Sequence, residues 1–138
     1  MKNFNSISIT GGIFGGILSF IFGGFDLLLK ALIVLVILDY ITGFIKGVIT
    51  KTLSSEVGYK GLLKKIVIFI VVIVSVVLQN VINNAIPLRE TVIIFFICNE
   101  GISILENASE FIPIPEKLKN VLMQLRQSND DESEAEND

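Results

Sequence analysis

The chain has 138 residues, of which 51% are hydrophobic, with a formal net charge of -3 and a mean hydropathy of +0.71. This composition is too apolar for an ordinary soluble domain, and the chain is too short for most transporters. An apolar composition and a short chain are together typical of a small multi-span membrane protein. The absence of His and the single Cys98 argue against a metal centre and a disulfide framework. We therefore expect an all-α membrane protein without a cofactor.

Residues 1–26 form a Gly-rich N-terminal segment. If residues 6–25 are helical, their small side chains gather into one stripe, and such a stripe lets two membrane helices approach closely. Four glycines are candidate helix-packing positions: Gly11, Gly12, Gly15 and Gly16. We expect an amphipathic helix that lies at the membrane surface or packs on the rest of the chain, with a fourth full span as the alternative.

Three longer apolar runs make up the predicted core, residues 27–115. A spanning helix needs about 20 mostly apolar residues. The runs at residues 27–49, 66–86 and 91–112 each reach this length, and prolines follow the second and the third of them. We therefore predict three transmembrane helices.

Basic residues predict the orientation of these spans. The connection between the first two runs is rich in lysine, whereas the next connection has only Arg89. By the positive-inside rule the first connection is cytoplasmic and the second external, and a cytoplasmic C-terminus agrees with both. The lysines are Lys46, Lys51, Lys60, Lys64 and Lys65.

Two carboxylates, Asp39 and Glu100, interrupt runs that otherwise suit lipid. An ionisable side chain at bilayer mid-depth costs roughly 2.5–3.5 kcal/mol on insertion scales, so such a group is normally kept for function or for pairing. Helical geometry places polar residues beside each acid. The first group is Asp39, Thr42, Gly43 and Lys46, and the second is Asn99, Glu100, Ser103, Glu106, Asn107 and Glu110.

A single three-helix chain has limited interior in which to hide these polar faces. The pattern therefore favours a homo-oligomer in which polar faces meet neighbouring subunits or line water. Two roles stay open for the acids, namely holding a helix bundle together or forming and triggering a pore. Asp39 can meet Glu100 within one chain or across two.

Residues 116–138 read as a cytoplasmic tail. Residues 116–126 alternate leucine and valine with charges, which predicts a short amphipathic helix at the interface. Residues 128–138 are acidic and lack large apolar side chains, so we expect them to be disordered. This acidic tail is a solubilising segment or, alternatively, a brake on assembly.

Two segments resemble the toxin-secretion/phage-lysis holin family. LDYITGFIKGVITKTLSSEVGYKGLLKK, residues 38–65, resembles the family's first-span and loop signature, and NEGISILENASEFIPIPEKLKNVL, residues 99–122, is similar to its third-span ending. The matching positions are Asp39, Thr42, Gly43, Ser54, Ser55, Gly58, Gly61, Lys64, Asn99, Glu100, Glu106, Asn107, Pro113 and Pro115. The acidic tail and the absence of a second Met near Met1 depart from the family pattern.

The resemblance implies a multi-pass protein of the bacterial cytoplasmic membrane that oligomerises and opens lesions. Such lesions release an endolysin, which causes host cell lysis, or large toxins, without a required direct contact between the proteins. The alternatives are an antiholin that inhibits a partner holin and a structural membrane-assembly subunit that forms no pore. No Ser-His, Cys-His or phosphate-loop constellation points to an enzyme, and the only other partner expected is membrane lipid, not nucleic acid.

Overall fold

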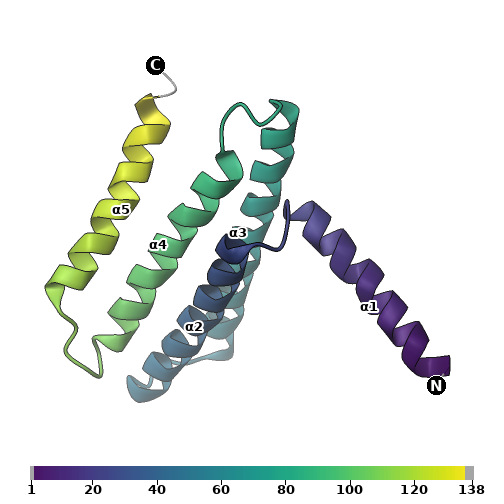
Figure 1. The fold of residues 1–138 in the computed structure, drawn as a ribbon. Coiled ribbons are helices and arrows are strands. Elements are labelled where there is room, and N and C mark those ends of the chain that lie inside the picture. The colour runs from purple at the N-terminus through teal and green to yellow at the C-terminus, as the bar shows by residue number, and fades with distance from the viewer. Residues whose placement is uncertain (1, 136–138) are drawn as a thin grey trace.

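The computed structural model describes residues 2–135, and this part of the chain consists of helices joined by short connections (Figure 1). In chain order the helices are α1 (Lys2–Ile21), α2 (Leu27–Ile49), α3 (Ser55–Val81), α4 (Leu88–Ala108) and α5 (Glu116–Ala135). No strand occurs in the described range. The predicted all-α class is confirmed.

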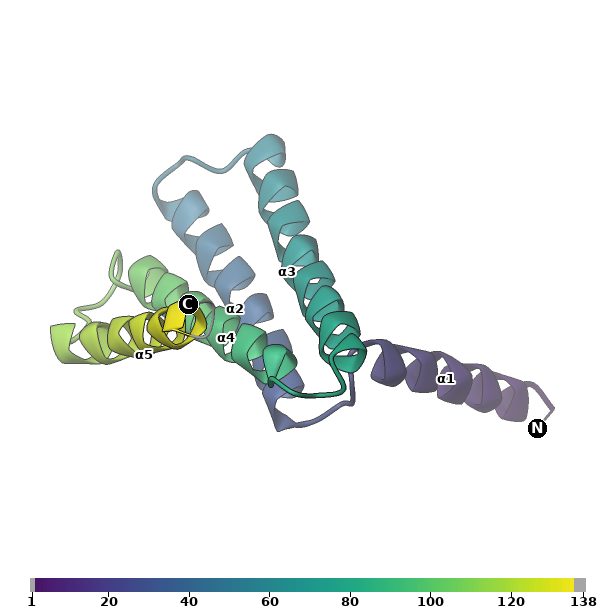
Figure 2. The same cartoon turned by 90° about the horizontal axis from the view of Figure 1, so that it is seen from above.

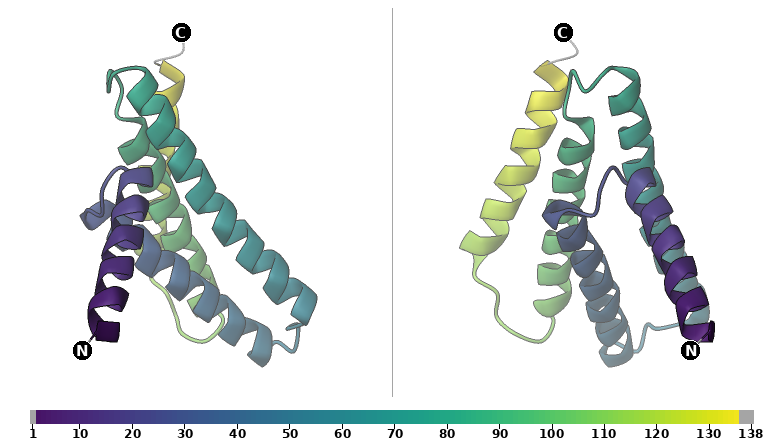
Figure 3. Two further views of the ribbon diagram at one scale, coloured as in Figure 1. Left: turned by 90° about the vertical axis from the view of Figure 1, so that its right-hand side faces the viewer. Right: turned by 45° about the vertical axis from the view of Figure 1, so that its right-hand side comes forward.

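The helices α2, α3 and α4 pack into a bundle, and α3 runs the full height of that bundle (Figure 3). Its core contains Leu32 and Val36 from α2, Ile68 and Val72 from α3, and Ile93 from α4. Leu32, Val72 and Ile93 have no exposed surface. The apolar core therefore joins all three helices that were predicted to form the membrane-spanning part.

The surface of the bundle distinguishes α2 and α3 from α4. By length and composition, α2 and α3 are apolar enough to cross a membrane, and the apolar part of α1, Asn5–Ile21, is shorter. Four charged residues lower the hydropathy of α4: Arg89, Glu90, Glu100 and Glu106. Membrane association of α2 and α3 is thus supported, whereas the predicted count of three or four spans is not confirmed.

The boundaries of the predicted spans agree with the helices to different degrees. The run at residues 27–49 coincides with α2, and the run at 91–112 overlaps α4. The prediction for the second run was wrong at its start, because α3 begins at Ser55. There the Ser54 side chain caps the helix by accepting a hydrogen bond from the Val57 N–H at 3.2 Å.

Because α3 starts early, three of the lysines that were predicted to lie in the connection between the first two spans belong to a helix. Lys60, Lys64 and Lys65 lie on the helix and not in a loop. At the other end α3 stops at Val81, because Asn83 and Asn84 adopt left-handed backbone conformations with φ of 54° and 58°.

The helix α1 projects away from the bundle (Figures 1 and 2). A Cβ atom built on any of the four candidate packing glycines would have no other heavy atom within 4 Å, apart from the atoms next to it on its own helix. The glycine stripe therefore makes no close helix contact with the residues that the structure describes. Its use between chains stays a prediction.

The helix α5 differs from its prediction in length and in place. It continues past residue 126 to Ala135, so the expected disorder was wrong for residues 128–135, and residues 136–138 lie outside the described range. No Gly or Pro after Pro115 interrupts helix propagation. α5 folds back beside α4, where Lys119 pairs with Glu106 at 3.4 Å (Figure 1).

A buried arginine ties the α1–α2 turn to the start of α4. Arg89, which is 4% exposed, binds the Asp26 carboxylate through Nη1 at 2.8 Å and Nη2 at 3.0 Å. Its Nε donates to the Phe22 carbonyl at 2.6 Å. Gly23 makes room for this side chain, because its φ is +73° and a Cβ there would lie 2.9 Å from the Arg89 Nε.

The Asp26–Arg89 pair predicts a specific acid sensitivity. The Arg89 guanidinium, by hydrogen-bonding the carboxylate, lowers the pKa of Asp26 from 3.8 to about 2, although partial burial opposes the shift. A depressed folded-state pKa contributes stability that is present above pH 3.8 and is lost as the pH falls toward 2. The thermal unfolding midpoints of the wild-type chain and Asp26→Asn in detergent should therefore converge across this window. Parallel midpoint curves would contradict the assignment.

Candidate functional site

An ion cluster within the bundle joins three helices. The ammonium of Lys65 on α3 donates to the Asp39 carboxylate on α2 and, at 2.6 Å, to Oε2 of Glu100 on α4. The side chains of Asp39 and Glu100 are 8% and 7% exposed, and that of Lys65 is 17% exposed. One cation therefore serves two buried anions from different helices.

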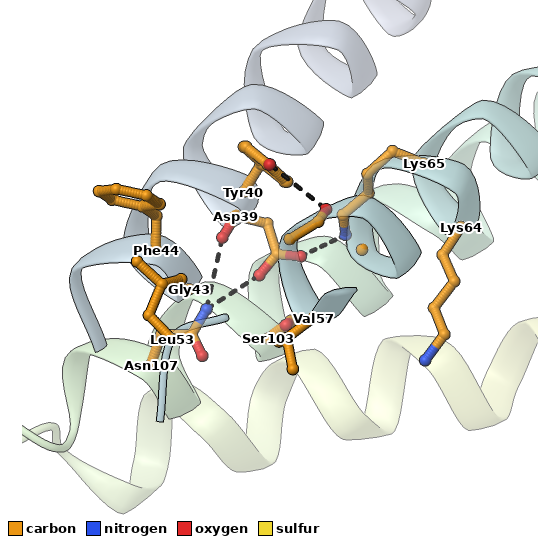
Figure 4. Close-up of a pocket in the computed structure, with 12 residues that line it drawn as sticks. Asp39, Tyr40, Gly43, Phe44, Leu53, Val57, Lys64, Lys65, Ser103 and Asn107 are labelled. Carbon is orange, nitrogen blue, oxygen red and sulfur yellow. Dashed lines mark hydrogen bonds and ion pairs between the residues drawn. The ribbon is translucent and has the colours of Figure 1, made fainter. Parts of the chain in front are cut away.

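An amide completes the coordination of Asp39 (Figure 4). The Nδ2 of Asn107 donates at 3.1 Å both to Oδ1 of Asp39 and to Oγ1 of Thr42. The Thr42 hydroxyl in turn donates to the Asp39 carbonyl at 3.1 Å. Both oxygens of the Asp39 carboxylate are thus bound, Oδ2 by Lys65 and Oδ1 by Asn107, which offsets part of the cost of burial.

Helix geometry separates this cluster from the Asp26–Arg89 pair. Asp39 follows Asp26 by thirteen residues along the chain, and Glu100 follows Arg89 by eleven. At 1.5 Å per residue, these carboxylates lie about 16–20 Å along the helices from that pair. The two polar contacts therefore hold the bundle at different depths of what would be a hydrocarbon core about 30 Å thick.

The structure brings together part of the predicted polar set. Asp39, Thr42, Glu100 and Asn107 share one network, and Gly43 lies beside it, since a Cβ there would be 3.6 Å from the Asn107 Nδ2. Two other ion pairs take Lys46, which pairs with Glu110 at 3.6 Å, and Glu106, which pairs with Lys119 of α5. Asn99 is half-buried on α4, and Ser103 lines a cavity together with Asp39 and Asn107.

The sequence prediction missed the central residue, Lys65. Its position directly before the run at residues 66–86 placed it in a loop, where it counted only toward orientation. The capping residue Ser54 was the signal that could have found it, because a helix that begins there carries Lys65 inside the bundle. The expectation that one chain has too little interior for its polar faces was also wrong for Asp39 and Glu100, because Lys65 of the same chain binds both carboxylates.

The sequence of this chain matches a known protein family. A sequence profile described as the bacteriophage holin family matches residues 16–127. The matched region contains all of α2, α3 and α4, and with them the Lys65 cluster and the Asp26–Arg89 pair.

Relatives in bacteria are similar over most of the chain. An uncharacterized 14.9 kDa protein in the nagH 3' region of Clostridium perfringens is 46% identical over 80% of this chain and 86% of its own length. A second Clostridium perfringens protein is 42% identical over 83% of this chain and 87% of its own length. A Listeria innocua protein is 37% identical over 88% and 87%, respectively. No solved structure matches significantly.

The cluster predicts a contrast between single and combined substitutions. Lys65→Met leaves two buried carboxylates without their cation and should lower the free energy of unfolding by about 3–5 kcal/mol. The combination of Asp39→Asn, Lys65→Met and Glu100→Gln removes all three charges and should cost less. Denaturant unfolding of the purified chain in detergent measures both.

The control is Lys60→Met, which removes an exposed ion pair with Glu56 on the same helix and should cost about 0–1 kcal/mol. A combined variant at least as unstable as Lys65→Met would contradict a charge-balanced cluster.

Proposed function

Because this chain belongs to the bacteriophage holin family, we propose that it acts as a holin. It oligomerises in the bacterial cytoplasmic membrane and opens lesions that release an endolysin, with host cell lysis as the result, or a large toxin. The released protein need only pass through the lesion, so no direct contact with it is required.

The observation that carries this proposal is a charged cluster inside a bundle with an apolar exterior. α2 and α3 expose many large apolar side chains, including Ile37, Ile41, Ile70 and Val74. Such a surface suits lipid, whereas the Asp39–Lys65–Glu100 cluster suits water once its partners separate. The chain therefore has the two environments that a closed and an open membrane state require.

The proposed topology has α2, α3 and α4 crossing the membrane. The end of the bundle at the α2–α3 connection carries Lys46, Lys51 and Lys60 and faces the cytoplasm by the positive-inside rule, which puts the Asp26–Arg89 pair on the external side. A cytoplasmic C-terminus requires α5 to part from α4 in lipid, because polar residues such as Lys117, Asn120 and Gln124 are exposed on the docked helix and need water.

In the proposed mechanism the Lys65 cluster holds the closed state. Separating the helices breaks the contacts of Lys65 and brings the charges of several subunits to a shared wet interior. Moving a charge across a potential of 100 mV changes the free energy by about 2.3 kcal/mol, so loss of the membrane potential can shift the balance between states.

The test is regulated expression in a bacterium together with an endolysin. The wild-type chain should abolish the membrane potential and release cytoplasmic marker proteins of graded size at the onset of lysis. Lys65→Met, compared at equal membrane levels, should advance the onset because its closed state is destabilised. Glu56→Gln alters a charge on the exposed part of α3 and should keep the wild-type onset.

The other outcomes separate the alternative functions. An intact membrane in cells that express the chain would indicate a structural membrane-assembly subunit. A delay in lysis by a second, co-expressed holin would indicate an antiholin. Release of ions without release of marker proteins would restrict the proposal to a small pore.

A further inference from the structure

The Lys65 cluster has more acids than bases. Lys65 supplies one ammonium, whereas Asp39 and Glu100 supply two carboxylates, so the fully ionised cluster has an excess of one negative charge. Lys64 forms no ion pair with either acid in the described structure, and its side chain points away from Asp39 (Figure 4). Both acids are more than nine-tenths buried, and a buried charge without a partner is so costly that the group normally takes up or loses a proton instead.

Other charged groups along α4 have partners of their own. Glu106 binds Lys119 of α5, and Glu110 binds Lys46 of α2. These two acids follow Glu100 by six and ten residues, which is about 9 and 15 Å along the helix at 1.5 Å per residue. Neither pair therefore supplies the positive charge that the cluster lacks.

The hydrogen bonds favour Glu100 as the acid that takes up a proton. Asp39 accepts N–H donors on both carboxylate oxygens, one from Lys65 and one from Asn107, and such donors stabilise the ionised form. Glu100 accepts from Lys65 through Oε2. A proton on Oε1 leaves this contact in place, because a neutral carboxyl group still accepts through its other oxygen. With Glu100 neutral, the cluster contains one cation and one anion.

A cavity of about 340 Å³ leads from the cluster toward the α2–α3 connection (Figure 4). Asp39, Lys65 and Asn107 line it, and so does Leu53, which belongs to that connection. Its volume and its polar groups suit several water molecules. A proton can therefore reach Asp39 and Lys65 from this end of the bundle.

The apolar core closes the cluster toward the Arg89 end of the bundle. One or two helical turns from the cluster in that direction lie Val36 on α2, Ile68 on α3 and Ile93 on α4. Their exposed fractions are 5%, 8% and 0%. In the proposed topology the cavity faces the cytoplasm, so the cluster exchanges protons with that side of the membrane.

We propose that the closed bundle binds one proton at the Asp39–Glu100 pair and releases it when the helices separate. An O–H bond forms on Glu100 while Lys65 keeps its charge. In the open state water solvates the acids, and a solvated glutamate is ionised at neutral pH. A lower pH on the cavity side therefore strengthens the closed state. The side of entry and the effect on opening rest on the proposed function, whereas proton binding by the folded bundle does not.

The test follows denaturant unfolding of the purified full-length chain in detergent between about pH 5 and 8. The chain has no His, so no other side chain ordinarily titrates in this window. A folded state that holds one more proton than the unfolded state loses stability as the pH rises, and the unfolding constant should increase about tenfold per pH unit. Glu100→Gln and Asp39→Asn each balance the cluster without a proton and should remove this dependence. Glu56→Gln alters an exposed carboxylate on α3 and should keep it.

Infrared spectroscopy detects the proton without comparing the stability of variants. At neutral pH the folded wild-type chain should show the C=O band of a protonated carboxyl group. Glu56→Gln should keep this band, and Glu100→Gln should lack it.

Three results would overturn the proton site. Parallel pH dependences of the wild-type chain and Glu100→Gln would assign the titration to another group. A wild-type spectrum without the carboxyl band would show that the folded cluster is fully ionised. A pH dependence that appears only in Lys64→Gln would mean that Lys64 supplies the missing charge. Because these measurements involve no lysis, a chain that binds the proton but fails to lyse cells separates this inference from the proposed function.

Discussion

The position of one ammonium group relates the three central helices to one another. Lys65 lies between carboxylates from α2 and α4, and neither acid is exposed enough to rely on water. The surrounding apolar contacts are non-directional and tolerate sliding, whereas a charge-assisted hydrogen bond specifies which turn of one helix faces which turn of the next. Removing the cation would leave two buried charges of the same sign, so the packing of the bundle depends on this contact.

The sequence predicts the helices better than the contacts between them. The run at residues 27–49 matches α2 because its apolar part begins directly after the capping Asp26. The start of α3 escapes a hydropathy argument, since the helix begins with a polar, lysine-containing stretch before residue 66. Asp39 and Glu100 stand out as anomalies in the sequence. Their shared partner requires knowing the relative depth of three helices, which no local pattern contains.

The internal pairing of the acids changes which surfaces remain for self-association. Asp39, Thr42, Glu100 and Asn107 meet within one chain, so they are not free to join subunits while the bundle is closed. The exposed apolar side chains of α2 and α3 and the uncovered glycines of α1 are the surfaces left over. In the proposed mechanism, assembly of closed chains and opening of the bundle would therefore be separable steps that use different residues.

The burial of the apolar side chains of α4 has a consequence for how the helices enter a membrane. Among its large apolar side chains in the described structure, Ile94 alone is exposed, while α2 and α3 present apolar side chains along their length. An α2–α3 hairpin can thus partition from the translocon into lipid unaided, and it carries Lys65 with it. In the proposed three-span topology, α4 would enter the bilayer by docking Glu100 on Lys65 of that hairpin. Insertion of α4 would then depend on the preceding helices, in the order in which they are synthesised.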